Sequence, residues 1–348
     1  MKKNLFMLLG ILLITVASFA KTITVSNNPT SPGQYKDLQT AIDAAKAGDI
    51  LLVSGSATDY GQVTINKRLT IYGQGYDPRK DVAFPTTIST IVLNNNLVND
   101  TASGSAIYGC VISSFYVAFN GDPSTYVNNI TVKRNTISYI GADGSGWVIS
   151  DNIITSQINI DGANCLIKNN VFTGSSINND NIHPNLIITN NDFTSTISLN
   201  IYNALVSNNI FYYKSSSVVN YVYGAYSNNT VFNNNIYYNN SNTNPFNIGQ
   251  NNITGTGNIN NKNPKFVSYD LTTQQITRND NLNLQSTSPA KNAGTDGKDL
   301  GIYGGATPAQ YPLSGEPAIP QVKTMNINNT TVSPGAVLQV QVKANSNN

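Results

Sequence analysis

Four charged residues occupy matching places in three successive copies of a short motif. They are Lys133 and Arg134 in the first copy, Asp151 in the second and Lys168 in the third. A basic side chain beside a carboxylate can transfer protons, as enzymes that cleave polysaccharides require. Arg134, Asp151 and Lys168 are therefore the candidate catalytic residues, and stacking of the copies would place Arg134 beside Asp151. The alternative interpretation is a surface salt bridge that contributes little energy.

Tyrosines form a second group that could bind a ligand. Eight of them lie between Tyr202 and Tyr238. Tyr212, Tyr213 and Tyr238 follow apolar positions of the repeated motif, so we expect them to point outward or to lie in loops. A tyrosine offers a flat apolar face with a hydroxyl group, which suits stacking on neutral sugars. Alternatively, these side chains pack wide loops against the rest of the protein.

The repeated motif that must position these residues is an octet with an asparagine at its sixth position. The copies are ITVKRNTI (130–137), WVISDNII (147–154), CLIKNNVF (165–172), LIITNNDF (186–193), ALVSNNIF (204–211) and TVFNNNIY (230–237). Their sixth residues are Asn135, Asn152, Asn170, Asn191, Asn209 and Asn235. A period near 20 residues indicates a solenoid, in which each coil stacks on the next.

The octet also predicts the path of the chain within a coil. Positions 1 and 3 are mostly apolar and share a face of a strand, whereas the apolar position 8 is out of step with them. The chain must therefore bend at the asparagines, which tolerate the left-handed backbone conformation. We expect the six sixth-position asparagines to hydrogen-bond to one another along the axis as a buried ladder. CVISSFYV (110–117) is expected to be a weaker copy of the octet.

The two cysteines are expected to be buried and unpaired. If 110–117 is an octet, Cys110 and Cys165 both occupy position 1 and are separated by three coils, or roughly 14 Å. A disulfide requires Cα atoms within about 7 Å.

Composition and charge narrow the class of function. The first 20 residues have Lys2 and Lys3 before an apolar run and small residues at 18 and 20, the pattern of a secretory signal peptide. Cleavage of the signal peptide would remove Lys2 and Lys3 from the 20 Lys and Arg residues. The remaining 18 basic residues balance the 18 Asp and Glu residues, so the mature chain is expected to be near neutral. A neutral chain does not attract a polyanion, so no nucleic-acid partner is expected. We expect a secreted or cell-surface monomer whose mature chain has no membrane span.

The expected organisation has three parts. Residues 1–20 are the signal peptide, and residues 21–312 are an all-β solenoid whose first part, 21–53, caps the coil with a short amphipathic helix. Residues 313–348 are a linker and a β hairpin, either a cover for the coil or an attachment segment.

Together these features resemble the right-handed parallel β-helix superfamily, the pectin-lyase-like fold. The resemblance extends from about residue 25 to 310 and includes the Leu38–Ile42 helix, Gly48-Asp49, Leu69-Thr70-Ile71-x-Gly73, the asparagine-bearing coils and Gly301-Ile302-Tyr303-Gly304-Gly305. It implies a fold rather than one activity, because the superfamily includes lyases, hydrolases, epimerases and adhesins.

The motifs of the hydrolases in this superfamily are not found in the sequence. There is no Asp-Asp pair and no Gly-His-Gly, and the single histidine, His183, precedes a proline as surface turn residues often do. No acidic cluster for a metal is visible, so no cofactor is expected, and Ca²⁺ would be needed only by a lyase. The sequence thus favours a non-catalytic module that binds a neutral polysaccharide or a cell-surface glycan. A polysaccharide lyase or glycoside hydrolase with a diverged site is the alternative.

Overall fold

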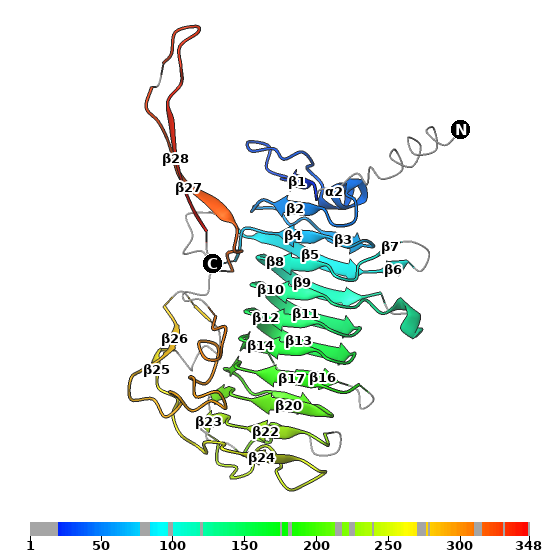
Figure 1. Cartoon of the computed structure of the whole chain (residues 1–348), viewed down its shortest axis with the longest axis vertical. Coiled ribbons are helices and arrows are strands. Elements are labelled where there is room, and N and C mark those ends of the chain that lie inside the picture. Colours follow the sequence, from blue (N-terminus) through cyan, green and yellow to red (C-terminus); the bar gives the residue numbers. More distant parts are fainter. Residues whose placement is uncertain are drawn as a thin grey trace, which may run out of the picture.

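The computed structural model shows a parallel β-helix, and the octets form its repeating bend (Figure 1). It describes residues 20–76, 84–96, 100–118, 121–174, 176–179, 183–212, 218–222, 227–238, 240–269, 276–277, 279–309, 315–329 and 331–346. The expected signal peptide lies outside the described residues except for Ala20. No helix formed by these residues is long and apolar enough to cross a membrane.

Two parallel sheets run the length of the coil. Sheet A takes positions 2 to 4 of each octet and consists of β1 (Thr22–Val25), β2 (Ile50–Val53), β4 (Thr70–Tyr72), β8 (Ala106–Tyr108), β10 (Thr131–Lys133), β12 (Val148–Ser150), β14 (Leu166–Lys168), β17 (Leu186–Thr189), β20 (Ala204–Ser207), β22 (Val231–Asn233) and β24 (Thr254–Thr256). β1 and β2 therefore already belong to the coil, within the 21–53 segment that is expected to cap it.

Sheet B begins after the bend. Its strands are β3 (Gln62–Ile65), β5 (Thr86–Leu93), β9 (Cys110–Val117), β11 (Thr136–Asp143), β13 (Ile153–Asp161), β15 (Val171–Phe172), β18 (Asp192–Phe193), β21 (Ile210–Tyr212) and β23 (Ile236–Tyr238). β16 (Ser176–Asn179) and β19 (Ser198–Asn200) pair in series with the far half of β13.

The predicted apolar columns fill the space between the sheets. Position 3 and position 8 side chains of all six octets are buried in one cluster. The rings of Phe172, Phe193 and Phe211 stack at centroid distances of 4.7 and 4.6 Å. These columns confirm the core that the octet predicts.

The bend lies at position 5, one residue before the ladder. Arg134, Asp151, Asn169, Asn190, Asn208 and Asn234 all have positive φ, between 52° and 60°. Most L residues avoid this left-handed region and asparagine tolerates it, which explains why asparagine recurs there.

The asparagine ladder is present and has one more rung than predicted. In each successive pair the side-chain oxygen of the later asparagine accepts hydrogen bonds from the backbone and side-chain amides of the earlier one, as Asn191 Oδ1 does from Asn170 N at 2.9 Å. The seventh rung is Asn258, whose Oδ1 accepts from Asn235 N at 3.0 Å. Its segment, 253–260, has Gly255 at position 3 and Asn260 at position 8, where the octet has apolar residues, so it did not match the octet.

The interpretation of 110–117 as an octet is wrong. This segment is β9 of sheet B, and Cys110 N donates to Asn135 Oδ1 at 2.9 Å, so Cys110 is level with the ladder. Cys165 does occupy position 1, and three coils still separate the two residues. Both cysteines are buried and free, as predicted.

A short helix covers the first coil, and other short elements lie in loops and in the C-terminal region. Helix α2 (Leu38–Ala44) packs against β1, β2 and β3, and Asp37 Oδ1 accepts from Thr40 N at its start. A 3-10 turn, η1 (Pro123–Thr125), and the pair β6 (Asn95–Asn96) and β7 (Asp100–Thr101) lie in loops. The C-terminal region has two antiparallel pairs, β25 (Phe266–Ser268) with β26 (Asn281–Leu284) and β27 (Pro320–Ile327) with β28 (Val340–Ser346). The second pair is the predicted hairpin, which projects away from the coil (Figure 1).

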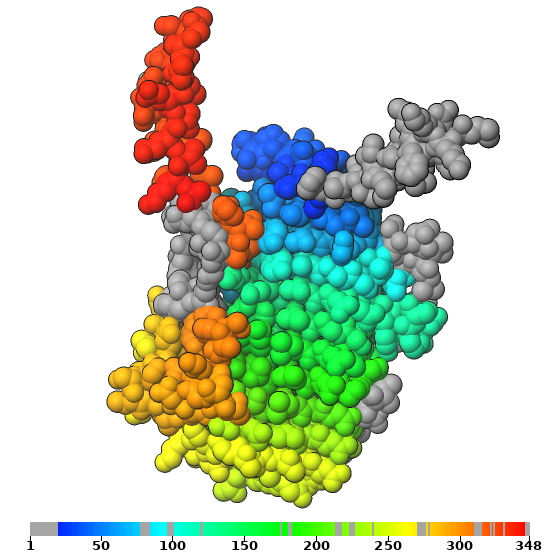
Figure 2. Space-filling view, in the orientation of Figure 1, coloured from blue at the N-terminus to red at the C-terminus, as the bar shows by residue number. Residues whose placement is uncertain are grey.

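Between these pairs, residues 288–309 form a segment that we call the C-terminal strap. It packs along the flank of the coil, on the orange part of the surface in Figure 2. The sequence predicts this segment as part of the 21–312 solenoid.

Candidate functional site

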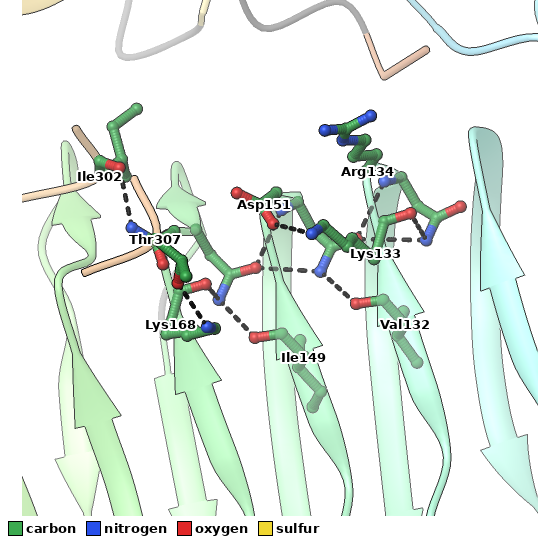
Figure 3. Close-up of polar contacts among 12 residues, drawn as sticks. Val132, Lys133, Arg134, Ile149, Asp151, Lys168, Ile302 and Thr307 are labelled. Carbon is green, nitrogen blue, oxygen red and sulfur yellow. Dashed lines mark hydrogen bonds and ion pairs between the residues drawn. The ribbon is translucent and has the colours of Figure 1, made fainter. Parts of the chain in front are cut away.

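The charged residues singled out by the sequence lie at the bend beside the C-terminal region (Figure 3). Asp151 Oδ2 lies 3.3 Å from Lys133 Nζ. Arg134 Nη1 donates to the carbonyl oxygen of Glu316 at 2.9 Å, and Lys168 Nζ donates to Thr307 Oγ1 at the same distance. These contacts connect the coil to the segment that follows it.

Neighbouring bend residues serve the same purpose. Asn169 Nδ2 donates to Ile302 O at 2.8 Å, and Asn234 Nδ2 donates to Ala293 O at 2.8 Å. Asn208 exchanges two hydrogen bonds with Thr295. The position 5 asparagines thus hold the C-terminal strap. Lys168, at position 4, contacts the same strap, whereas Arg134 contacts Glu316 beyond it and Asp151 pairs with Lys133 of the coil.

The predicted sugar-binding tyrosines also meet the C-terminal region. Tyr212 and Tyr238 stack with centroids 5.5 Å apart, and the Tyr212 ring makes an edge contact with Phe266 at 5.3 Å. Burial, followed by the neighbouring Tyr238, raises the pKa of Tyr212 above its usual value. Tyr213 lies outside the described residues. These are the packing contacts that the sequence left open as the alternative.

A different group of ionisable residues gathers at the far end of sheet B. Asp143 ends β11 and Asp161 ends β13, and the two are directly paired in register. Neighbouring parallel strands are about 4.8 Å apart, so the carboxyl groups lie on adjacent coils of one face. Both alternate with the buried residues Ala142 and Ile160, which directs their side chains outward.

His183 and a tyrosine complete this group. His183 Nδ1 lies 3.0 Å from Asp161 Oδ1, and Tyr126 Oη donates to Asp161 Oδ2 at 2.7 Å. The Tyr126 and His183 rings meet edge to face at 6.3 Å. The histidine that the sequence indicated as a turn residue therefore orients a carboxylate.

The two carboxyl groups have different environments. Desolvation, and then repulsion from Asp161, raise the pKa of Asp143 to about 6. Asp161 accepts from Tyr126 Oη, and its other oxygen lies 3.0 Å from His183 Nδ1. A carboxyl group that is protonated below about pH 6, beside a second carboxyl group held by polar contacts, is an arrangement that acid–base catalysis uses.

A row of amides adjoins the carboxyl pair. Asn178 Nδ2 donates to Asn159 Oδ1 at 2.9 Å, and Asn200 Nδ2 donates to Asn178 Oδ1 at 2.7 Å. Asn159 Nδ2 donates to Tyr139 Oη at 3.3 Å. These partly exposed side chains occupy the outward face of three successive strands, β13, β16 and β19. We call them the amide row.

A glycine makes room for the aromatic residue at the head of the amide row. A Cβ at Gly141 would lie 3.1 Å from Tyr139 Oη, so this residue lets the ring lie close against the sheet. The outward face of sheet B therefore presents a tyrosine, three amides and two carboxyl groups within a few strands.

The octet search could not find this face, because it lies on the other side of the coil. A signal was present: Asp143-Gly144 and Asp161-Gly162 each stand four residues before position 1 of an octet. Equal offsets in successive repeats place residues in one column. Among the described residues, no three His, Cys, Asp or Glu side chains form a group that could hold a metal ion.

The fold and the polar outward face of sheet B together define a class of protein, the parallel β-helix proteins with a polar outward sheet. No protein-family model matches the chain, and no curated protein matches it. Among solved structures it is similar to the crystal structure of pectate lyase Pel9A, at 14% identity and a TM-score of 0.34, over 84% of this chain and 97% of that one. The fold assignment rests on the strand pairing described above.

Proposed function

We propose that this protein is an exported carbohydrate-binding β-helix whose ligand, a neutral polysaccharide or cell-surface glycan, lies across the outward face of sheet B. The amide row is the observation that supports this proposal most directly. Asn159, Asn178 and Asn200 repeat at the spacing of the coils and form one chain of hydrogen bonds that ends at the Tyr139 hydroxyl.

The chemistry of this face matches that of a sugar chain. Sugar hydroxyls both donate and accept hydrogen bonds, as amides do, and a tyrosine ring packs against the apolar face of a pyranose. A rigid sheet presents these groups without loss of loop entropy. The near equality of acidic and basic residues after the expected signal peptide suits a neutral ligand.

A glycan array with the full secreted chain tests this proposal. Asn178→Ala removes the central amide and should weaken binding roughly tenfold, which corresponds to a loss of about 1.4 kcal/mol of binding free energy. Asn233→Ala is the matched control, because Asn233 is a partly exposed asparagine on the outward face of sheet A. No binding to any glycan, or equal losses in the two variants, would reject the proposal.

The carboxyl pair favours a second candidate, hydrolysis of the bound chain. Protonated Asp143 would donate its proton to the glycosidic oxygen as the C–O bond breaks. Because the roughly 5 Å spacing of neighbouring strands leaves no room for a water between the two groups, ionised Asp161 would bond to the anomeric carbon as that bond breaks. Water would then hydrolyse this glycosyl ester, with its proton passing to Asp143, and release ionised Asp161. The products would be one new reducing end and one new hydroxyl group.

A polysaccharide panel distinguishes the two candidates. Hydrolysis gives new reducing ends that disappear in Asp143→Asn and Asp161→Asn, while binding persists. A lyase would instead give products that absorb in the ultraviolet, and the panel should be run with and without Ca²⁺ for that outcome. Binding without any new end assigns the protein to the non-catalytic class.

A further inference from the structure

The C-terminal strap covers a column of side chains at the start of the sheet B strands. The column consists of Ile153, Val171, Asp192, Ile210 and Ile236. Its four aliphatic members share a buried cluster with Ala290, Leu300 and Ile302 of the strap. One carboxylic acid therefore stands in an otherwise aliphatic interface.

Asp192 is enclosed by that interface. It is 1% exposed, and its Oδ1 accepts from the backbone amide of Ile302 at 3.3 Å. Its Oδ2 is buried and has no hydrogen-bond partner among the described residues. A Cβ at Gly301 would lie only 2.2 Å from Oδ1, so the strap backbone lies directly on the carboxyl group.

We propose that Asp192 makes the docking of the C-terminal strap dependent on pH, so that the strap is held firmly in acid and opens more readily as the pH rises. The physical reason is the cost of burying an ionised carboxylate with a single amide donor and no counter-charge. Opening of the strap would return the side chain to water, where it ionises freely.

The direction follows from linkage. Burial raises the pKa of Asp192 well above its usual value, while the Ile302 amide lowers it by less. Docking is therefore strongest below the ordinary carboxyl pKa of about 4 and weakens as the pH rises through and above it. Because one proton is released on opening, the opening constant rises by up to about tenfold per pH unit until docked Asp192 itself ionises.

Other charged groups on the packed elements are occupied elsewhere. On the strap, Asp299 is paired with Lys291 at 2.7 Å, whereas Asp296 and Lys298 are exposed. On the coil, Lys168 contacts Thr307. Val171 and Ile210, the column neighbours of Asp192, are uncharged. No charged partner accounts for the raised pKa of Asp192, so this group dominates the response.

The same opening would uncover Ile210 and Ile236, which belong to the cluster that the strap shares. The proposal does not depend on glycan binding by the amide row.

Hydrogen exchange of the full chain, followed by mass spectrometry from pH 4 to pH 8 and corrected for the intrinsic rate, tests this proposal. The readout is the protection of peptides from 288–305 relative to peptides from β14 and β17. Asp192→Asn keeps the size of the side chain and cannot ionise. Asp192→Val supplies the residue found one coil earlier, at Val171, and Asp296→Asn removes an exposed charge from the same strap as the control.

We expect strap protection in the wild type to fall toward pH 8 by tenfold or more, while the β14 and β17 peptides change little. Both Asp192 variants should lose this dependence, and Asp296→Asn should keep it. Protection of β14 and β17 reports that each variant is folded. A wild-type strap whose protection does not change with pH, or an equal dependence in a folded Asp192 variant, overturns the proposal.

Discussion

Replacing Asn191 by alanine should be among the most destabilising substitutions in the chain. Its Nδ2 donates to Ile167 O, Thr189 O and Asn209 Oδ1, each at 3.0 Å. Its Oδ1 accepts from the backbone and side-chain nitrogens of Asn170 at 2.9 and 3.0 Å. The side chain therefore satisfies two backbone carbonyls and one backbone amide in addition to two ladder neighbours.

Alanine would leave these buried groups without partners. Each unsatisfied buried group costs about 1–3 kcal/mol, and partial relaxation recovers some of that. We expect Asn191→Ala to lower the free energy of unfolding by about 4 kcal/mol, which is exceptional for one substitution. The measurement is urea unfolding followed by far-ultraviolet circular dichroism.

Asn185→Gly is the control for this experiment. Asn185 is an exposed asparagine with φ of 65°, and its Nδ2 makes one described hydrogen bond, to Asn164 Oδ1 at 2.9 Å. Glycine accepts this backbone conformation, so the loss should stay below about 1 kcal/mol. If Asn191→Ala costs no more than Asn185→Gly, the ladder does not carry the stability that we assign to it.

Two further outcomes are expected. Iodoacetamide should leave both cysteines of the native protein unmodified, because burial raises the pKa of Cys110 to about 12 and also raises that of Cys165. It should label both in the unreduced, denatured chain, because both thiols are free. Failure to label the denatured chain would indicate a disulfide. The raised pKa of Asp143 means that its contribution to stability is greatest below the ordinary carboxyl pKa and is lost as the pH rises toward about 6. Asp161→Asn should therefore lower the pKa of Asp143 measured by carboxyl ¹³C NMR, whereas an unchanged pKa would show that repulsion between the two is negligible.

The sequence predicted the coil because its signal is local and repeated. Six copies of the octet fix the bend, the ladder and the apolar columns, since every coil must bury the same positions. The prediction failed where a segment departed from the pattern. The expected weak copy at 110–117 is a strand of sheet B, and Asn258 was missed because Gly255 and Asn260 stand at positions 3 and 8 of its segment.

The candidate site was harder to predict because it depends on the far half of each coil. That half varies in length, from a nine-residue β13 to the separate short strands β15 and β16, so no fixed spacing marks it. The contacts of the C-terminal strap are also invisible in the sequence, because they join residues from 59 positions apart, as in Asn234 with Ala293, to 139 apart, as in Lys168 with Thr307. Arg134 and Lys168 could be selected from the sequence because they are charged. Their partners, Glu316 and Thr307, are known only from the structure.

Hydroxyl-radical footprinting of the full chain, with and without the glycan that binds most tightly on the array, tests the central claim most directly. Tyr139 and Tyr126 lie on the sheet B side, and Tyr108 on the outward side of sheet A is the internal control. We predict that the glycan lowers the oxidation of Tyr139 and Tyr126 and leaves that of Tyr108 unchanged. Protection of Tyr108 with no change at Tyr139 would contradict the placement of the ligand on sheet B.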